Sequence, residues 1–384
     1  MSSMTDQNHE EPGRPVTSLY VHIPYCGSAC PYCDFAFVVG QDHTAGRYVE
    51  ALARELTLRS EADRIGPFDT VYFGGGTPSS LDPARIEELL KVVDTVAGLQ
   101  SGAEITLEAD PLHTDRYGAY LDCGITRLSI GIQSFADRDL QALGRRHDAR
   151  QARDAIRAAR SANFQNVSID LIFGAPEQTV EAWRTTLEAA IQLAPDHLSI
   201  YGLTIEPETP FGRRHARGRL PVVSEEDQAS MFGWTQDRLT RSGYDHYEIS
   251  NYALTGMQSR HNLACWRGRS YLGVGASAHS FDGTRRSWNV RDLKTYLDRI
   301  EATQDAVENF ETLTTEQRQL ERLMLGLRTA EGINADWSSK PATTATVAAL
   351  VDRDVLEQRD GKLRLTTRGR IVADSVCEQL AGSL

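Results

Sequence analysis

Short apolar segments alternate with longer amphipathic segments from residue 18 to residue 203 of this 384-residue chain. The apolar segments predict strands at 18–23, 70–73, 104–107, 127–132, 167–173 and 197–203. The amphipathic segments between them predict helices at 45–60, 83–96, 116–122, 150–162 and 180–193. Such alternation is typical of parallel βα units, whose right-handed crossovers place the strands side by side. The sequence therefore predicts an α/β fold built on a partial (β/α)6 TIM-like barrel.

Polar and glycine residues follow several of these predicted strands. A glycine triplet begins the segment 74–79 after the second strand, and 108–111 ends the third. The segment 133–135 follows the fourth strand, and Asp170 interrupts the otherwise apolar fifth. Because barrel proteins gather their chemistry at the carboxyl ends of the strands, we expect one shared site there. The glycine triplet lacks the Lys-Ser/Thr ending of a phosphate-binding loop.

The segment after the first strand carries three cysteines, Cys26, Cys30 and Cys33. Three thiolates can hold three corners of a [4Fe–4S] cluster, which usually takes four protein ligands, so one iron would be open to another molecule. Half of a structural zinc site is an alternative, although such sites want four ligands. A disulfide would leave one thiol over. His22, in the preceding apolar run, is as well explained as a strand residue.

Composition narrows the class of protein. The net charge of −12 argues against a general nucleic-acid binder. No stretch approaches the ~20 apolar residues of a membrane span, and residues 1–17 lack the apolar centre of a secretory signal. The other cysteines, Cys123, Cys265 and Cys377, are scattered, which fits a reducing compartment. We therefore expect a cytoplasmic protein.

Four regions are predicted along the chain: a disordered tail at 1–17, the barrel at 18–245, a linking region at 246–310 and a C-terminal domain at 311–384. A helix at 224–242 falls near the end of the barrel. In the last region we expect helices at 315–328, 343–352 and 368–380, and strands at 355–358 and 362–365 around the turn Asp360-Gly361. This order resembles a winged helix. Such domains often bind DNA, but the acidic composition favours a structural or partner-binding cap.

The spacing Cys-x3-Cys-x2-Cys with the glycine triplet resembles the radical S-adenosylmethionine (radical SAM) superfamily. Within it, the segments 20–24, 74–78, 130–135, 170–174 and 247–251 look like the group containing oxygen-independent coproporphyrinogen III dehydrogenase and the heme chaperone HemW. The resemblance runs from about residue 18 to the C-terminus.

The resemblance implies a [4Fe–4S] cluster on Cys26, Cys30 and Cys33, with SAM on the open iron. It also implies a role in SAM binding for nine further residues. Tyr20 and Tyr32 would flank the methionine end, Gly75, Gly76 and Thr77 would approach the amino group, and Glu108, Gln133, Arg145 and Asp170 would contact the rest.

Two features favour the heme chaperone branch. The dehydrogenases carry a further cysteine where this chain has Phe35, and they have a longer segment before the first strand. The chaperones carry His-Asn-x-x-Tyr-Trp, and residues 261–266 read His-Asn-Leu-Ala-Cys-Trp. His261 would be the heme-iron ligand and Trp266 would pack on the porphyrin. Cys265 either fills the place of the tyrosine or ligates the iron itself, and His261 as an ordinary hydrogen-bonded histidine stays open.

The resemblance therefore predicts a heme chaperone that binds the cluster, SAM and heme and delivers heme to respiratory hemoproteins. It implies an electron donor, leaves SAM cleavage open, and allows peripheral contact with a membrane. The alternative is the dehydrogenase itself, an enzyme of porphyrin biosynthesis that oxidatively decarboxylates two propionates of coproporphyrinogen III.

Overall fold

The computed structural model describes residues 15–62, 64–338 and 340–383. Most of the predicted tail at 1–17 lies outside these residues. Its last two residues, Val16 and Thr17, belong instead to the first strand of the sheet. No helix within the described residues combines the length and the apolar character that crossing a membrane requires.

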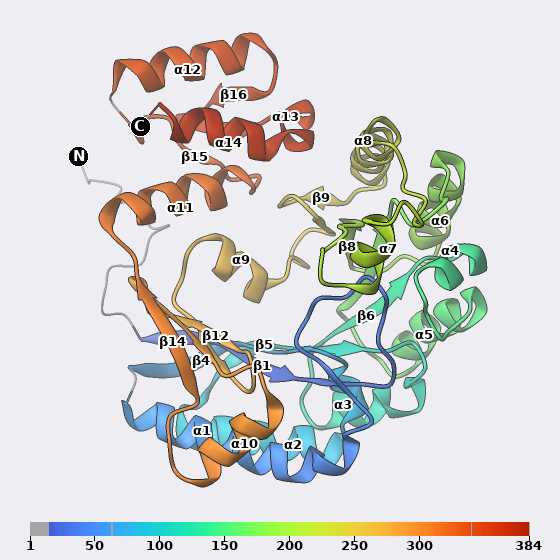
Figure 1. The fold of residues 1–384 in the computed structure, drawn as a ribbon, viewed down its shortest axis with the longest axis vertical. Helices are drawn as coiled ribbons and strands as arrows, with labels where there is room; N and C mark the ends of the chain where they lie inside the picture. Colours follow the sequence, from blue (N-terminus) through green and yellow to red (C-terminus); the bar gives the residue numbers. More distant parts are fainter. Residues whose placement is uncertain (1–14, 63, 339, 384) are drawn as a thin grey trace.

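Among the described residues, nine strands form one sheet, and its centre is the predicted parallel barrel. Six parallel strands follow one another in chain order: β1 (Val16–Ile23), β4 (Ile65–Gly75), β5 (Leu99–Ala109), β6 (Arg127–Gln133), β7 (Val167–Phe173) and β8 (His197–Gly202). The helices between them are α1 (Ala45–Ala62), α2 (Pro83–Val96), α3 (Tyr117–Asp122), α4 (Asp137–Ala142), α5 (Ala149–Ser161) and α6 (Val180–Gln192). They lie along the outer face of the curved sheet (Figure 1). The α/β barrel prediction is confirmed.

Three short strands extend this sheet beyond the predicted six. β11 (Leu272–Val274) pairs in parallel with β1. β10 (Asn251–Ala253) runs antiparallel to β8, and β9 (Asp245–His246) pairs with β10. Part of the region 246–310 therefore belongs to the barrel sheet. Strands of two or three residues form through tertiary pairing. They are too short to show a clear hydrophobic period, so the sequence does not predict them.

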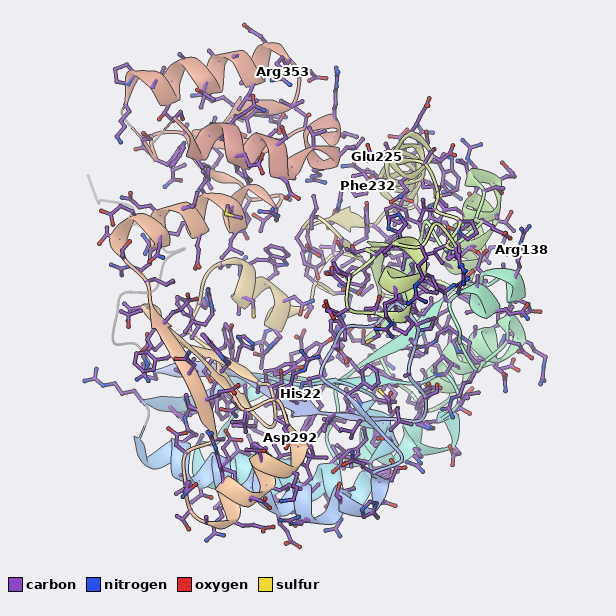
Figure 2. All side chains as sticks on the ribbon, in the orientation of Figure 1. His22, Arg138, Glu225, Phe232, Asp292 and Arg353 are labelled. Carbon is purple, nitrogen blue, oxygen red and sulfur yellow. The ribbon has the colours of Figure 1, made fainter. Side chains whose placement is uncertain are left out.

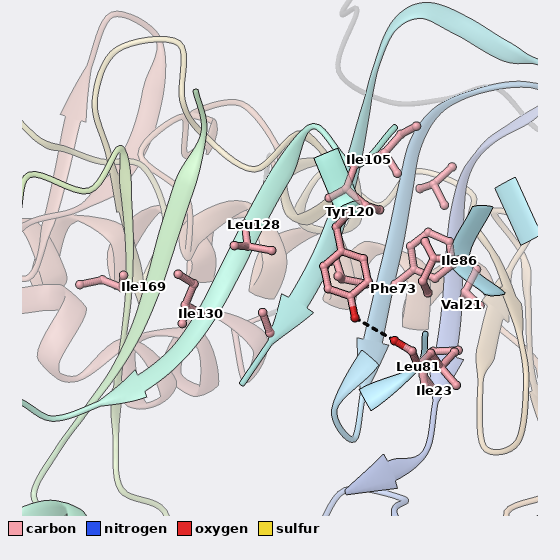
Figure 3. Packing of buried hydrophobic residues seen from close by; sticks show 14 of the residues in the cluster. Val21, Ile23, Phe73, Leu81, Ile86, Ile105, Tyr120, Leu128, Ile130 and Ile169 are labelled. Atoms are coloured by element: carbon pink, nitrogen blue, oxygen red, sulfur yellow. Dashed lines mark hydrogen bonds between the residues drawn. The ribbon is translucent and has the colours of Figure 1, made fainter. Parts of the chain in front are cut away.

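The interior of the barrel wall is a continuous apolar core. Leu19, Val21 and Ile23 of β1 and Phe73 of β4 are fully buried. Figure 3 shows Val21, Ile23 and Phe73 packed with residues of the strands and helices that follow. The Tyr120 hydroxyl within this core donates to the carbonyl oxygen of Leu81 at 2.8 Å. This packing holds the strands rigidly, so their carboxyl ends are fixed relative to one another.

The remaining segments surround the barrel mouth and one edge of the sheet. They are β2 (Tyr25–Cys26), β3 (Val38–Val39), α7 (Pro210–His215), α8 (Glu225–Arg241), α9 (Arg260–Trp266), β12 (His279–Phe281), β13 (Arg285–Asn289), α10 (Leu293–Glu301) and β14 (Val307–Thr312), with short 3-10 helices η1 (Asp42–Thr44), η2 (Pro78–Ser80) and η3 (Thr114–Arg116). β12, β13 and β14 form a separate antiparallel sheet that the sequence did not indicate. α9 lies between the barrel and the C-terminal elements (Figure 1).

The C-terminal elements form a unit with its own apolar core. They are α11 (Thr315–Leu327), β15 (Ile333–Asn334), α12 (Pro341–Asp352), β16 (Leu356–Arg359), β17 (Lys362–Leu365), α13 (Thr367–Ile371) and α14 (Ala373–Ala381). Asp360 and Gly361 both have positive φ, as a tight hairpin turn requires.

The prediction of a single helix at 368–380 is wrong, because the helix is interrupted at Val372, whose φ of −117° and ψ of 30° are not helical. The two halves pack on different partners. Gly369 of α13 lies against the Val355 carbonyl, whereas α14 packs on α11 and α12.

Candidate cofactor site

A cavity of about 470 Å³ opens at the carboxyl ends of the parallel strands. This volume falls within the range of about 300–1,000 Å³ that is usual for small-molecule sites. Thirteen site residues were predicted, and eleven of them, all except Tyr20 and His261, lie on the wall of this cavity. All three cysteines, Tyr32, Gly75, Gly76, Thr77, Glu108, Gln133, Arg145 and Asp170 line this cavity. The fold thus brings together residues from the cysteine loop and from the ends of four consecutive strands, β4 to β7, as the sequence predicted.

The cysteine loop is held over the cavity by contacts to the sheet. His22 Nε2 bonds to the carbonyl oxygen of Ala36 at 2.8 Å, from its place on β1 near the centre of the molecule (Figure 2). The Thr77 hydroxyl donates to the Cys26 thiol at 3.5 Å, and Arg145 donates to the Cys30 sulfur at 3.5 Å. The three thiols therefore face the same space with donors already beside two of them.

The thiols form no disulfide, and no group of three or more His, Cys, Asp or Glu side chains in the described part of the chain could hold a single metal ion. A structural zinc site usually takes four protein ligands, whereas three thiolates can hold three corners of a four-iron cluster. Burial raises the pKa of the Cys33 thiol to about 11. Cluster loading at neutral pH therefore releases protons.

The glycine triplet is required for packing between β1 and β4. Gly75 has a φ of +114°, and a Cβ there would lie 2.5 Å from the His22 ring. A Cβ on Gly76 would lie 2.7 Å from the Pro24 carbonyl. Close approach of the backbones therefore requires glycine at both positions, and Gly75 and Gly76 line the cavity.

Two carboxylates lie inside the cavity with their own hydrogen-bond partners. Glu108 accepts from the Tyr72 hydroxyl at 2.8 Å and from the Gly75 amide at 3.1 Å. Burial, reinforced by the nearby Asp170, raises the pKa of Glu108 to about 7. Burial also raises the pKa of Asp170, which accepts from the Ser129 hydroxyl at 3.2 Å. The wall therefore holds acidic groups that suit a cationic ligand.

Arg145 provides the opposite charge near the cysteines. Its guanidinium donates to the Gly131 carbonyl at 3.0 Å and lies 3.8 Å from the Asp110 carboxylate. Gln133, at the end of β6, adopts a positive φ of 67°, which is uncommon for a residue other than glycine and is often found at functional positions. The cavity can thus bind a small ligand that carries both a cationic group and a carboxylate.

Tyr20 lies behind the cavity wall, where its ring stacks on Tyr72 with the centroids 6.1 Å apart. Its hydroxyl lies 3.2 Å from His22 Nδ1. Tyr20 therefore does not line the cavity; its ring centroid lies 6.5 Å from that of His261, and its hydroxyl contacts the histidine that anchors the cysteine loop.

His261 lies on α9, buried against β4 on the cavity side of the sheet. Its Nδ1 is 3.0 Å from the Thr70 hydroxyl, and its ring centroid is 5.1 Å from that of Tyr72. Within the described residues, Nε2 has no hydrogen-bond partner. Burial, with the positive charge of Arg127, lowers the pKa of His261 to about 4, so the imidazole is neutral at neutral pH.

Cys265 follows His261 by one helical turn, and burial raises the pKa of its thiol to about 11. It is therefore a protonated thiol at neutral pH. The neighbouring Asn262 reaches the cavity wall, which the sequence reasoning did not anticipate.

Sequence reasoning also missed Arg127, a fully buried side chain that lines the cavity. Arg127 looks like an ordinary residue at the start of a strand. The signal that could have revealed it is its period-two alignment with Ser129, Gly131 and Gln133, which puts all four on one face of β6.

Comparison with known proteins agrees with this architecture. The model of the radical SAM superfamily matches residues 20–190, and the chain belongs to that superfamily. The coproporphyrinogen III oxidase HemN of Escherichia coli, described as a radical SAM enzyme, has a similar structure. Its TM-score is 0.82 at 25% sequence identity, over 98% of this chain and 92% of that one.

Within the superfamily, the chain belongs to the family of proteins named heme chaperone HemW. It is 38% identical to the Synechocystis relative over 345 residues, which cover 87% of this chain and 83% of the relative. It is 31% identical to the Bacillus subtilis relative, over 96% of this chain and all of that protein.

The position of α9 generates a testable prediction. The buried Glu104 carboxylate accepts from the backbone amides of Arg260 and His261 at 3.0 and 3.1 Å. Glu104→Ala leaves both amides without a partner, so we expect the free energy of unfolding to fall by about 1–3 kcal/mol. Amide hydrogen exchange across 260–266 should become faster. Glu87→Ala, which removes an exposed ion pair with Lys91, is the control. Unchanged exchange in Glu104→Ala would show that α9 is held by other contacts.

Proposed function

We propose that this chain is a heme chaperone of the radical SAM type that delivers heme to respiratory hemoproteins. The observation that carries the proposal is 38% identity, over 87% of this chain, to a protein named heme chaperone HemW. Position 35 adds support. It is a phenylalanine, 65% exposed on the cavity rim, where the dehydrogenase pattern has a further cysteine.

Membership of the superfamily implies a [4Fe–4S] cluster and SAM. We assign the cluster to Cys26, Cys30 and Cys33, whose free thiols share one cavity. The cluster would supply an electron to the sulfonium group of SAM. Glu108 and Asp170 would bind the cationic part of SAM and Arg145 its carboxylate, while Gly75, Gly76, Thr77, Gln133 and Tyr32 complete the wall. Tyr20 would act indirectly, by supporting His22.

We assign the heme iron to His261. Ligating histidines are usually oriented by a hydrogen bond at the other ring nitrogen, and Thr70 provides one at Nδ1. The low pKa keeps the imidazole neutral, which is the ligating form. Cys265 would fill space as a protonated thiol. Because His261 is only 5% exposed, heme can reach Nε2 only if α9 shifts.

The second candidate is coproporphyrinogen III dehydrogenase, favoured by the TM-score of 0.82 to HemN. Reconstituted protein given coproporphyrinogen III, SAM and a reductant discriminates the two. We expect stable heme binding and no protoporphyrinogen. Robust protoporphyrinogen formation without heme binding would favour the enzyme.

The cellular setting forms part of the proposal. The chaperone would work in the cytoplasm, receive electrons from a separate donor, and meet its acceptors by peripheral contact with the membrane.

Cys30→Ser tests the cluster assignment. We expect anaerobic reconstitution to give about four irons per chain in the parent protein and near-background iron in the variant, because one corner loses its thiolate. Cys123→Ser is the matched control, since Cys123 does not line the cavity. Full iron and brown absorbance in Cys30→Ser would contradict the assignment.

His261→Ala should weaken heme binding about tenfold or more, because the axial ligand is lost. Cys265→Ala should change the affinity little, because a protonated thiol is a poor ligand. Heme titration followed by absorbance measures both. The opposite ranking would identify Cys265 as the ligand.

The affinity for SAM should depend on pH through Glu108. With a pKa of about 7, this carboxyl is mostly ionised at pH 8 and mostly protonated at pH 6. Only the ionised form attracts a cation, so the affinity should fall about tenfold between these values. Equilibrium binding measures the effect, and Glu108→Gln reveals any pH dependence that belongs to SAM itself. Equal slopes in the two proteins would exclude Glu108 as the cause.

A further inference from the structure

Arg127 is a buried cation whose Nε lacks a hydrogen-bond partner within the described residues. It is 2% exposed, and within the described residues its guanidinium makes no hydrogen bond or ion pair, with Nε fully enclosed. A buried charge is normally paired, because leaving water is costly. The side chain nevertheless lines the cavity, so its free N–H groups can meet a ligand there.

A second unsatisfied group lies beside it. Thr106 on β5 is the direct cross-strand partner of Arg127 on β6, and Tyr72 on β4 is the partner of Thr106. Side chains at directly paired positions share one face of a sheet. The Thr106 hydroxyl is fully buried and also lacks a partner. Arg127 and Thr106, on adjacent strands, therefore each carry a hydrogen-bond donor that no acceptor within the described residues satisfies.

The nearby acidic side chains do not fill this role. Glu108 pairs across the sheet with Ser129, one inward-facing position further along β6 than Arg127. It already accepts from Tyr72 and Gly75, while Asp170 accepts from Ser129. Their influence on Arg127 is electrostatic only, since neither lies within ion-pair distance of it.

Arg127 occupies the end of the cavity remote from the cysteines. β6 runs from Arg127 to Gln133, and Arg145, which contacts Cys30, bonds to Gly131 near the far end of that strand. At the Arg127 level lie Tyr72 and the His261 ring packed on it, and the positive charge of Arg127 contributes to the low pKa of that histidine. Arg127 and the Tyr72 ring therefore line the inner end of the cavity, and the Thr106 hydroxyl and the His261 imidazole lie next to them outside its lining.

We propose that Arg127, assisted by Thr106, binds a carboxylate at the inner end of the cavity, and that this carboxylate is a propionate of the heme. The proposal rests on the heme-binding function proposed above. Guanidinium groups bind carboxylates with paired N–H bonds. His261, the proposed heme ligand, packs on Tyr72 at the same level of the sheet as Arg127. SAM is the other source of a carboxylate, but Arg145 already provides a guanidinium at the cysteine end.

The test compares heme with heme dimethyl ester, in which the propionates are uncharged, on the full chain with its cluster reconstituted. We expect the ester to bind the parent protein about tenfold more weakly than heme, a comparison that needs no variant. Arg127→Gln should weaken heme binding about tenfold and leave ester binding unchanged, so that the variant no longer distinguishes the two. Measured well above the pKa of Glu108, its affinity for SAM should fall far less than its affinity for heme, because Arg127 acts on Glu108 and Asp170 only through its charge.

Arg146→Gln is the matched control. Arg146 lines the same cavity at the cysteine end, beside Gly27, so its loss should preserve the preference for heme over the ester. Equal binding of heme and ester by the parent protein would overturn the inference and leave the heme-binding function standing. A loss of SAM affinity in Arg127→Gln with the heme preference intact would also overturn it, by assigning the carboxylate to SAM. Absence of heme binding in the parent would contradict the proposed function as well.

Discussion

The pairing of β1 with β4 is the interaction on which the site depends. Their parallel register sets His22 beside Gly74 and Ile23 beside Gly75. Beyond the strand ends the backbones remain bonded, because the Gly76 amide donates to the Ile23 carbonyl and the Thr77 amide to the Tyr25 carbonyl, both at 2.8 Å. The cysteine loop and the glycine loop therefore approach the cavity as one unit. No side chain other than hydrogen fits at Gly75 or Gly76 without moving this unit.

Burial of charge is the second constraint. Glu108, Asp170, Arg127 and Arg145 share one enclosed space, and desolvation raises the pKa of both carboxyls. Such groups are costly in a structural core and are retained where a ligand completes their pairing. Acidic groups at the middle of the cavity, one guanidinium at the cysteine end and another at the inner end suit ligands that carry both a cation and carboxylates.

Much of the fold is predictable because the hydrophobic period is strong where the strands are long. The strand at 167–173 and the helix at 83–96 have the predicted bounds. β9, β10 and β11 were not predicted, because strands of two or three residues are stabilised by pairing with neighbouring strands and show no local hydrophobic pattern. The clustering of the site residues was predictable because the carboxyl ends of the parallel strands of a barrel lie close together. The period-two pattern of β6 could have placed Arg127 on the cavity face. The buried position of His261 could not be inferred, since it depends on contacts between segments far apart in sequence.

The central claim is that three thiolates leave one iron of a four-iron cluster open to SAM. Electron paramagnetic resonance of the anaerobically reconstituted and reduced protein tests it most directly. The account predicts the signal of a [4Fe–4S]⁺ centre and a change in that signal when SAM is added. A spectrum without a four-iron centre, or one that SAM leaves unaltered, would contradict it.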